Sequence, residues 1–208
     1  MVNRDNLLAW IDALVQIYAE NKQFLTQLDS AIGDADHGIN MDRGFQAVAA
    51  DLAKTNPQDI STLLKTVAMA LIRTVGGAAG PLYGTFFMRA SATCANKAEL
   101  GPADVVALFE AGLEGIVQRG KAELNDKTMV DAQKPALEAM KQALADGADV
   151  KTILQKGTAA AEEGMKNTIP LQARKGRASY LGERSIGHQD PGATSSYLMI
   201  KAAADLWA

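Results

Sequence analysis

Apolar residues recur at three- and four-residue steps along most of this 208-residue chain. This spacing is typical of amphipathic helices, because residues three and four apart share one helical face. No segment shows a convincing alternation of apolar and polar residues between hairpin turns, which would indicate strands. The clearest series predicts the first helix and comprises Leu7, Ile11, Leu14, Tyr18, Leu25 and Leu28. The pattern therefore predicts an all-α protein.

The same spacing predicts further helices, several of them with recognisable ends. Asn56-Pro57 closes the second helix, because the residue before a proline disfavours the helical conformation. Asp126 is a plausible N-cap of a later helix, in which Pro135 predicts a kink or a break. The remaining helices are predicted from Met41 to Leu52, Ile60 to Leu71, Phe86 to Cys94, Gly101 to Val117, Val150 to Lys166 and Ala193 to Trp207.

The composition agrees with helical structure and with one domain. Apolar residues make up 48% of the chain and aromatic residues only 5%. Ala, Leu and Met, which favour helix over strand, supply most of the apolar fraction. The chain is long enough for one substantial core and too short for two large ones. Without a boundary or a repeat of solenoid period, residues 1–208 are predicted to form a single domain.

Charge and cysteine content narrow the possible partners and the cellular compartment. A net charge of −3 and a pI near 5.4 argue against a nucleic-acid surface and a basic membrane-binding face. The single Cys94 excludes an internal disulfide and agrees with a reducing cytosol. The N-terminus lacks an apolar signal core, and no run of about 18 apolar residues occurs. We therefore expect a cytoplasmic protein that binds neither nucleic acid nor membrane.

Three aspartates stand close together in the segment 28–41. Asp29, Asp34 and Asp36 flank a turn in which Gly33 and Gly38 relax the backbone. Carboxylates this close repel one another unless a cation lies among them. All-oxygen ligation indicates a hard ion, either Mg²⁺ or Ca²⁺. The alternative is that these are solvated loop acids or a helix N-cap.

A calcium-binding EF-hand loop is the obvious competitor for this segment. Counted from Asp34, such a loop needs glycine at position 39 and glutamate at position 45, where this chain has Ile39 and Phe45. Magnesium fits better, since it takes one or two carboxylates, several waters and a phosphate.

Two further segments could contact phosphate. His37 and Asn40 fall near the start of the second helix, where free N–H groups and the helix dipole favour an anion. The small-residue run from Gly76 to Thr85 would let backbone N–H groups approach a ligand closely. Taken alone, the run from Gly76 to Thr85 favours the other interpretation, a tight turn between closely packed helices.

A third segment, Gly115 to Ala122, imitates a P-loop up to its last position. A P-loop requires Ser or Thr where this chain has Ala122, and a strand before the first glycine, where a helix is predicted. We reject it as a Walker motif.

The segment from Gln172 to Gly192 concentrates positive charge in an otherwise acidic chain. Its basic residues are Arg174, Lys175, Arg177 and Arg184, and glycines separate them. Long connections in compact domains are usually functional, and guanidinium groups suit bidentate phosphate contacts. A solvated, flexible connection before the last helix is the other interpretation.

Taken together and in order, these motifs resemble one family, the nucleotide-binding L subunits of dihydroxyacetone kinases. Each motif is modest alone, whereas five in sequence are highly specific and cover nearly the whole chain. The matching segments are Gly33–Gly38, Gly76–Gly84, Arg119–Ala122, Asp126–Met129 and Lys175–Gly192.

The resemblance implies an antiparallel eight-helix barrel with Mg²⁺ and a nucleotide at one rim. The positions that match magnesium ligands, for two ions, are Asp29, Asp34 and Asp36. The positions that match nucleotide contacts are His37, Gly38, Ile39, Asn40, Ala78, Ala79, Gly120, Met129, Arg177, Asp190, Pro191 and Gly192. Arg177 is the expected catalytic residue, because its charge would offset the negative charge that develops during transfer.

The resemblance also implies an activity and partners. A phosphotransferase-system protein, supplied from phosphoenolpyruvate, would rephosphorylate bound ADP, and the resulting ATP would pass its γ-phosphate to dihydroxyacetone on a separate K subunit. The enzyme class is phosphoenolpyruvate-glycerone phosphotransferase. The alternatives are an ATP-dependent subunit and a nucleotide-loaded module that contacts a regulator.

Two positions depart from the family pattern. The family commonly has Ser where this chain has Ala79, so a hydroxyl contact to phosphate is lost. Asn125 stands where Gly is usual. Neither position matches a metal ligand, so we expect a weaker or rearranged site rather than an inactive one.

Overall fold

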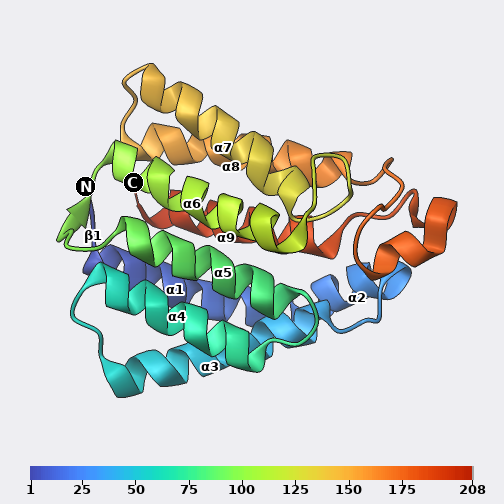
Figure 1. Cartoon of the computed structure of the whole chain (residues 1–208), viewed down its shortest axis with the longest axis horizontal. Helices are drawn as coiled ribbons and strands as arrows, with labels where there is room; N and C mark the ends of the chain where they lie inside the picture. The colour runs from blue at the N-terminus through green and yellow to red at the C-terminus, as the bar shows by residue number, and fades with distance from the viewer. Residues whose placement is uncertain (208) are drawn as a thin grey trace.

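The computed structural model describes residues 1–207 and is almost entirely helical (Figure 1). This confirms the predicted all-α class. Within the described residues a two-stranded antiparallel sheet, β1 with β2, joins the N-terminus to the segment before α6. The elements are β1 (Val2–Asn3), α1 (Arg4–Glu20), α2 (Lys22–Ile32), α3 (His37–Thr55), α4 (Ile60–Thr74), α5 (Ala79–Thr93), β2 (Glu99–Leu100), α6 (Pro102–Gly120), α7 (Val130–Ala145), α8 (Val150–Asn167), the 3₁₀ helix η1 (Arg177–Ser185) and α9 (Pro191–Leu206).

The long helices lie roughly along one direction, and successive helices run up and down (Figure 1). In such a bundle alternate connections meet at the same end. Four connections gather at the end opposite the labelled termini: α2 to α3, α4 to α5, α6 to α7, and the segment that carries η1. Segments far apart in the sequence are thereby assembled into one rim.

One large hydrophobic core holds this arrangement, and within it Phe87, Phe109 and Trp207 surround Trp10. The Trp10 indole is fully buried and donates a hydrogen bond to the main-chain oxygen of Met199, at 3.0 Å. Trp207 packs edge-on against it, with ring centroids 4.9 Å apart. These contacts tie α9 to α1, so the last helix closes the bundle against the first.

The predicted first helix is wrong in one respect, because Asn21 divides it into α1 and α2. The Asn21 amide and backbone N–H both donate to the Ile17 carbonyl oxygen, each at 2.9 Å, and so end α1. The apolar spacing continues across the interruption because both helices face the same core. Counted as one interrupted helix, α1 and α2 bring the described α-helices to the eight that the family resemblance implies.

The prediction for Asp126 is also wrong. Its carboxylate accepts a hydrogen bond from the Glu123 backbone N–H, at 2.9 Å, and α7 begins only at Val130. Asn125 and Lys127 have positive φ angles of 73° and 63°, which an α-helix cannot contain. The helix therefore starts after this turn.

Pro135 does not break its helix, contrary to one of the two predictions made for it. It lies inside α7, which runs on to Ala145. Proline lacks the N–H that would pair with the Asp131 carbonyl four residues earlier. Gly164 of α8 packs against that carbonyl, where a Cβ would lie only 2.1 Å from the oxygen. The neighbouring helix therefore occupies the position beside the unpaired group.

The end of α3 agrees with the sequence, whereas the start of α5 does not. α3 ends at Thr55, with Asn56 in the left-handed conformation before Pro57. α5 begins at Ala79, inside the small-residue run, and not at Phe86.

Cys94 is buried as a free thiol. No helix among residues 1–207 combines the length and apolarity needed to cross a membrane.

Candidate functional site

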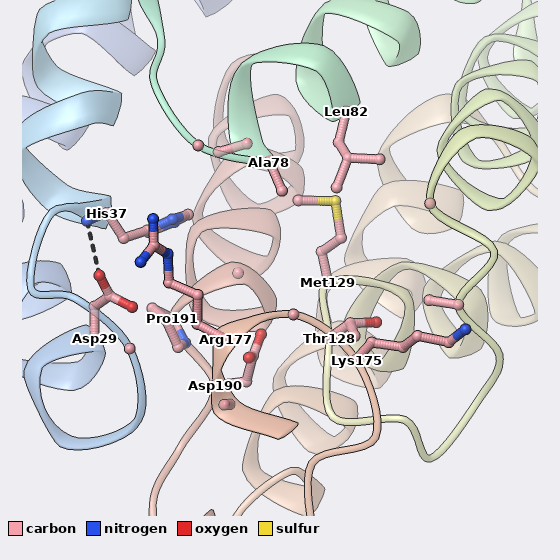
Figure 2. Close-up of a pocket in the computed structure, with 18 of the residues that line it drawn as sticks. Asp29, His37, Ala78, Leu82, Thr128, Met129, Lys175, Arg177, Asp190 and Pro191 are labelled. Carbon is pink, nitrogen blue, oxygen red and sulfur yellow. Dashed lines mark hydrogen bonds between the residues drawn. The ribbon is translucent and has the colours of Figure 1, made fainter. Parts of the chain in front are cut away.

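The rim encloses a cavity of about 400 Å³ (Figure 2). Its polar part contains Asp29, His37 and Arg177, while Met129 and Leu82 face each other in its apolar part. Of the predicted site residues, those that line it are Asp29, Asp34, Asp36, His37, Asn40, Ala78, Ala79, Gly120, Met129, Arg177, Asp190, Pro191 and Gly192. The fold thus assembles nearly all of them around one space.

Gly38 and Ile39 are the two predicted residues that the structure places outside the cavity lining. Gly38 packs against α2, where a Cβ would lie 2.0 Å from the Lys22 carbonyl oxygen. Ile39 is exposed and contributes to a shallow surface depression beside α2. Gly38 therefore serves the close approach of α2 to the first turn of α3.

The three aspartates form a compact cluster. One carboxylate oxygen from each lies within 4.8 Å of the others. Asp29 is buried in the last turn of α2, and its Oδ2 accepts hydrogen bonds from the backbone N–H groups of Asp36, at 2.8 Å, and His37, at 3.1 Å. It thereby stabilises the start of α3.

The other two carboxylates are available for a ligand. Asp36 occupies the N-cap position of α3 but makes no capping hydrogen bond with its side chain. Asp34 is partly exposed, and Ala35 between them has a positive φ of 59°. The helix-cap interpretation thus applies to Asp29, whereas three converging oxygen donors suit a hard divalent cation.

His37 links the cavity to a buried polar chain. Its Nε2 lies 2.9 Å from Ser195 Oγ, which lies 2.7 Å from the Tyr83 hydroxyl. Burial lowers the pKa of His37 from 6.5 to about 4, although Asp29 and Asp36 oppose the shift. The imidazole is therefore neutral at physiological pH, and its ring position is set by a side chain of α9.

Arg177 and Asp34 form an ion pair across the rim, with Nη2 3.2 Å from Oδ2. The arginine side chain is 66% exposed, so the pair contributes little to stability. Arg177 is the first residue of η1 and follows Gly176, which has a φ of 64°. Its guanidinium is thus placed beside the aspartate cluster by a turn in the basic segment.

Asp190 is buried where η1's segment meets α9. Its Oδ2 accepts the Ala193 backbone N–H at 2.7 Å, and its own N–H donates to Thr168 Oγ1 at 3.0 Å. Burial raises the pKa of Asp190 from 3.8 to about 7, with the hydrogen bond from Ala193 acting in the opposite direction. Asp190 thus caps α9 and fixes Pro191 and Gly192 at the cavity wall.

Other residues, which the sequence argument did not assign, also support or line the cavity. Arg43 donates to Asn40 Oδ1 at 2.6 Å and to the Thr74 carbonyl oxygen at 2.9 Å, so it joins the start of α3 to the end of α4. The sequence signal for this contact was the position of Arg43 three residues after Asn40, since residues three apart are neighbours on a helix surface. Lys127 and Lys175 line the cavity. Arg174 and Arg184, from the same basic segment as Lys175, are absent from the lining.

The structure accounts for one departure from the family pattern and places the other. Asn125 has a φ of 73°, and asparagine adopts this left-handed conformation more readily than most residues other than glycine. Ala79 is the first residue of α5 and lines the cavity. The segment that imitated a P-loop lies at the end of α6. A helix therefore stands where a P-loop needs a strand, as predicted.

The fold and the site define a class: an all-α protein whose rim joins a carboxylate cluster to the N-terminus of a helix. The chain belongs to the DAK2 domain family, which matches residues 31–205.

Two full-length relatives agree with this assignment. The chain is 44% identical to the ADP-binding subunit DhaL of the PEP-dependent dihydroxyacetone kinase of Escherichia coli K12, over 98% of this chain and 97% of that one. It is 39% identical to the ADP-binding subunit DhaL of the PTS-dependent dihydroxyacetone kinase of Lactococcus lactis, over 99% of both chains.

A solved structure shows the same fold. The dihydroxyacetone kinase of C. freundii, in complex with AMP-PNP and Mg²⁺, superposes with a TM-score of 0.72 and 26% identity. The match covers 94% of this chain and 33% of that longer one. The chain therefore corresponds to one third of that kinase.

Proposed function

We propose that this chain is the nucleotide-carrying, phosphoryl-transfer subunit of a phosphoenolpyruvate-dependent dihydroxyacetone kinase. The observation that carries the proposal is the aspartate cluster at the start of α3, with Arg177 directly beside it. Identity to ADP-binding subunits over almost the full length supports the same conclusion.

The donor set fits magnesium. Asp29, Asp34 and Asp36 offer three carboxylates and no sulfur or nitrogen ligand, which is the chemistry that a hard ion prefers. We propose that they hold two Mg²⁺ ions, which when bound neutralise phosphate charge. Asp29 is oriented for this role by the backbone of Asp36 and His37.

The nucleotide would lie along the cavity from its apolar to its polar part. Met129 and Leu82 provide an apolar surface for the base, and Gly120 leaves space next to Leu82. The N-termini of α3 and α5 lie at the rim, where the helix dipole favours phosphate, although the His37 N–H is already taken by Asp29. The other proposed nucleotide contacts are His37, Asn40, Ala78, Ala79 and the segment Asp190–Gly192. The proposal also includes Gly38 and Ile39, which lie in the first turn of α3.

Arg177 is the proposed catalytic residue. Phosphoryl transfer depends mainly on positioning and on neutralising charge. A guanidinium at the open side of the cavity can offset negative charge as the γ-phosphate leaves. Because the side chain is largely exposed, an acceptor bound to another subunit can approach it.

Three partners follow from the proposal. A separate K subunit would hold dihydroxyacetone, and a phosphotransferase-system protein would rephosphorylate ADP in place, both in the cytoplasm. A regulator could also dock on the nucleotide-loaded chain. The free-standing length of the DhaL relatives favours bound nucleotide as a cofactor over an exchanging substrate.

A comparison of phosphate donors tests the proposal. The chain is mixed with its K subunit and dihydroxyacetone, and product formation is measured with phosphoenolpyruvate plus the phosphotransferase proteins, or with ATP alone. We expect multiple turnover with the first donor and little with the second. Efficient turnover on ATP with rapid nucleotide exchange would instead show an ATP-dependent subunit. Stable Mg²⁺-ADP binding without transfer from either donor would show a binding module.

A further inference from the structure

Lys127 is a buried lysine at the junction of two cavity walls. The residue is 1% exposed, although lysine is among the residues least often buried. Its backbone has a φ of 63°, a conformation that residues other than glycine rarely adopt. Strain of this kind persists where the surrounding structure requires it, and it clusters at functional sites.

The Lys127 ammonium is saturated by main-chain oxygens. It donates to the carbonyl of Thr168 at 2.7 Å, to that of Leu171 at 3.1 Å, and to that of His188, while the Ile169 carbonyl oxygen lies 3.5 Å from the same nitrogen. An ammonium has three protons, so three acceptors satisfy it. Thr168 is the C-cap of α8, and the C-terminal end of a helix favours a positive charge. The Thr168 carbonyl oxygen also accepts the Leu171 N–H, at 3.2 Å.

These acceptors stand at the two ends of the segment 168–190, which carries η1 and Arg177. Two other hydrogen bonds join the two ends of this segment: Gly187 N–H to the Ile169 oxygen, at 2.8 Å, and Asp190 N–H to Thr168 Oγ1, at 3.0 Å. In Figure 1 this segment forms the orange-red connection at the end opposite the termini. The ammonium therefore joins both ends of the segment at one point.

The same residue is covalently continuous with the apolar wall of the cavity. Thr128 and Met129 follow it directly and line the cavity. The Arg174 N–H donates to the carbonyl of Asp126, at 3.1 Å, and so adds a backbone contact beside it. The wall that would contact the base and the segment that carries Arg177 thus meet at Lys127.

We propose that Lys127 is a positioning residue that holds the segment 168–190 over the cavity and thereby places Arg177 for phosphoryl transfer. This role rests on the proposed function of the site. Lys127 differs from a Walker lysine because its ammonium is occupied by carbonyl oxygens and so does not act on a phosphate.

The first test uses hydrogen exchange of the isolated chain and needs no partner subunit. Lys127→Met keeps the apolar stem and removes the ammonium. We expect amide exchange to accelerate at least about tenfold in residues 169–190, because the segment loses its common anchor, while α4 and α5 keep their protection. Lys121→Met is the matched control, since Lys121 also has a positive φ, of 54°, but is exposed and outside the cavity lining.

The second test separates positioning from general stability with a double-mutant cycle. Arg177→Ala should lower the transfer rate more than nucleotide affinity, because a charge clamp acts most on the transition state. Lys127→Met should lower the transfer rate roughly ten- to a hundredfold, as expected for a misplaced catalytic group. If Lys127 acts through Arg177, the double variant should transfer no more slowly than the slower single variant.

Unchanged exchange in residues 169–190, or strictly additive effects on transfer, would overturn the inference. If Lys127→Met does not fold, Lys127→Gly serves instead, because glycine adopts the left-handed backbone without strain. A wild-type chain that neither retains Mg²⁺-ADP nor transfers phosphate would refute the proposed function. The exchange result would still decide whether Lys127 anchors the segment.

Discussion

Single carboxylates in this protein have different roles that depend on their surroundings. Asp29 is buried and receives two backbone N–H groups, so it builds the start of α3 as well as the cluster. Asp34 and Asp36 are more exposed and lack such bonds to the helix they precede. The cluster therefore combines one structural acid with two that leave the start of α3 uncapped, of which Asp34 pairs with Arg177.

The first prediction concerns Asp34→Asn and Asp36→Asn. Each substitution should weaken Mg²⁺-ADP binding about tenfold to a hundredfold. Loss of a residue that only hydrogen-bonds to a metal ligand already has an effect of this size. The fold should persist, because the substitution also relieves repulsion among the carboxylates. Equilibrium dialysis measures binding, and circular dichroism measures helical content.

Asp205→Asn provides the control for these variants. Asp205 pairs with Lys201 of the same helix, α9, at 2.5 Å, outside the cavity lining. Its loss removes an ion pair but no proposed ligand, so nucleotide binding should stay at the wild-type level. Full ADP retention by Asp34→Asn would refute the metal assignment.

The second prediction concerns the pH dependence that Asp190 confers. The pKa of Asp190 in the folded chain is about 7, against an ordinary value of 3.8. The folded state therefore holds a proton that the unfolded state releases, and the contribution of Asp190 to the free energy of unfolding falls as pH rises through this window. Asp190→Asn, which keeps an N-cap acceptor, should gain stability relative to wild type between pH 4 and about 8.

Urea denaturation without Mg²⁺ or nucleotide measures this difference. Asp149 is the matched control, because it caps α8 through Thr152 N–H and its pKa is lowered, chiefly by that hydrogen bond. Its stabilising contribution is present at neutral pH and lost in acid, so Asp149→Asn should show the opposite trend. A stability difference for Asp190→Asn that does not change with pH would contradict the second prediction.

At the scale of elements, the site depends on how closely α2 and α3 pack. Gly38 permits this contact, since a Cβ there would lie 2.0 Å from the Lys22 oxygen and 2.6 Å from Thr26 Oγ1. The start of α3 and the aspartate turn are held by the same approach. A change in helix separation would therefore reach the cluster without touching a carboxylate.

The third prediction is that Gly38→Ala lowers the free energy of unfolding by about 1–3 kcal/mol or more, because overpacking forces the backbones apart. Mg²⁺-ADP binding should weaken with it. Gly101→Ala at the N-cap of α6, where the nearest atom would lie 3.7 Å away, should cost less than about 1 kcal/mol. Chemical denaturation of both variants checks the prediction, and equal losses would contradict it.

At the scale of the whole molecule, the proposed nucleotide site exists only in the folded state, because four connections must meet at one rim to form it. Ligand that binds only this form stabilises it by mass action. The residues of the cavity come from α2, α3, α5, α6, α7, η1, α9 and the connections between helices, so unfolding any large part of the bundle should release the ligand. Thermal stability therefore reports on the assembled site.

The fourth prediction is that Mg²⁺-ADP at about a hundred times its Kd raises stability by about 2.7 kcal/mol. For a chain of this size that corresponds to a rise in Tm of roughly 5–10 °C. EDTA should abolish the rise, and Asp34→Asn should reduce it to about half or less at the same ligand concentration. Scanning calorimetry measures the shift, and an equal rise with ADP in the presence of EDTA would contradict a metal-dependent site.

The sequence by itself determined the helical class and most helix ends, because apolar spacing and residues such as Asn56-Pro57 act locally. It also determined the aspartate cluster and the basic segment as groups of chemically matched residues. Tertiary packing decided the rest. Asn21 interrupts the first helix without a break in its apolar face, and positive φ angles at Asn125 and Lys127 delay α7.

Only the folded structure brings Asp34 to Arg177 and closes the segment 168–190 on Lys127. Both contacts join positions far apart in the chain, and the acceptors of Lys127 are main-chain oxygens, which every residue type carries. Residue identity thus gives no local signal for such a contact. Its existence follows from the geometry of the rim, where the up-and-down order of the helices brings alternate connections together.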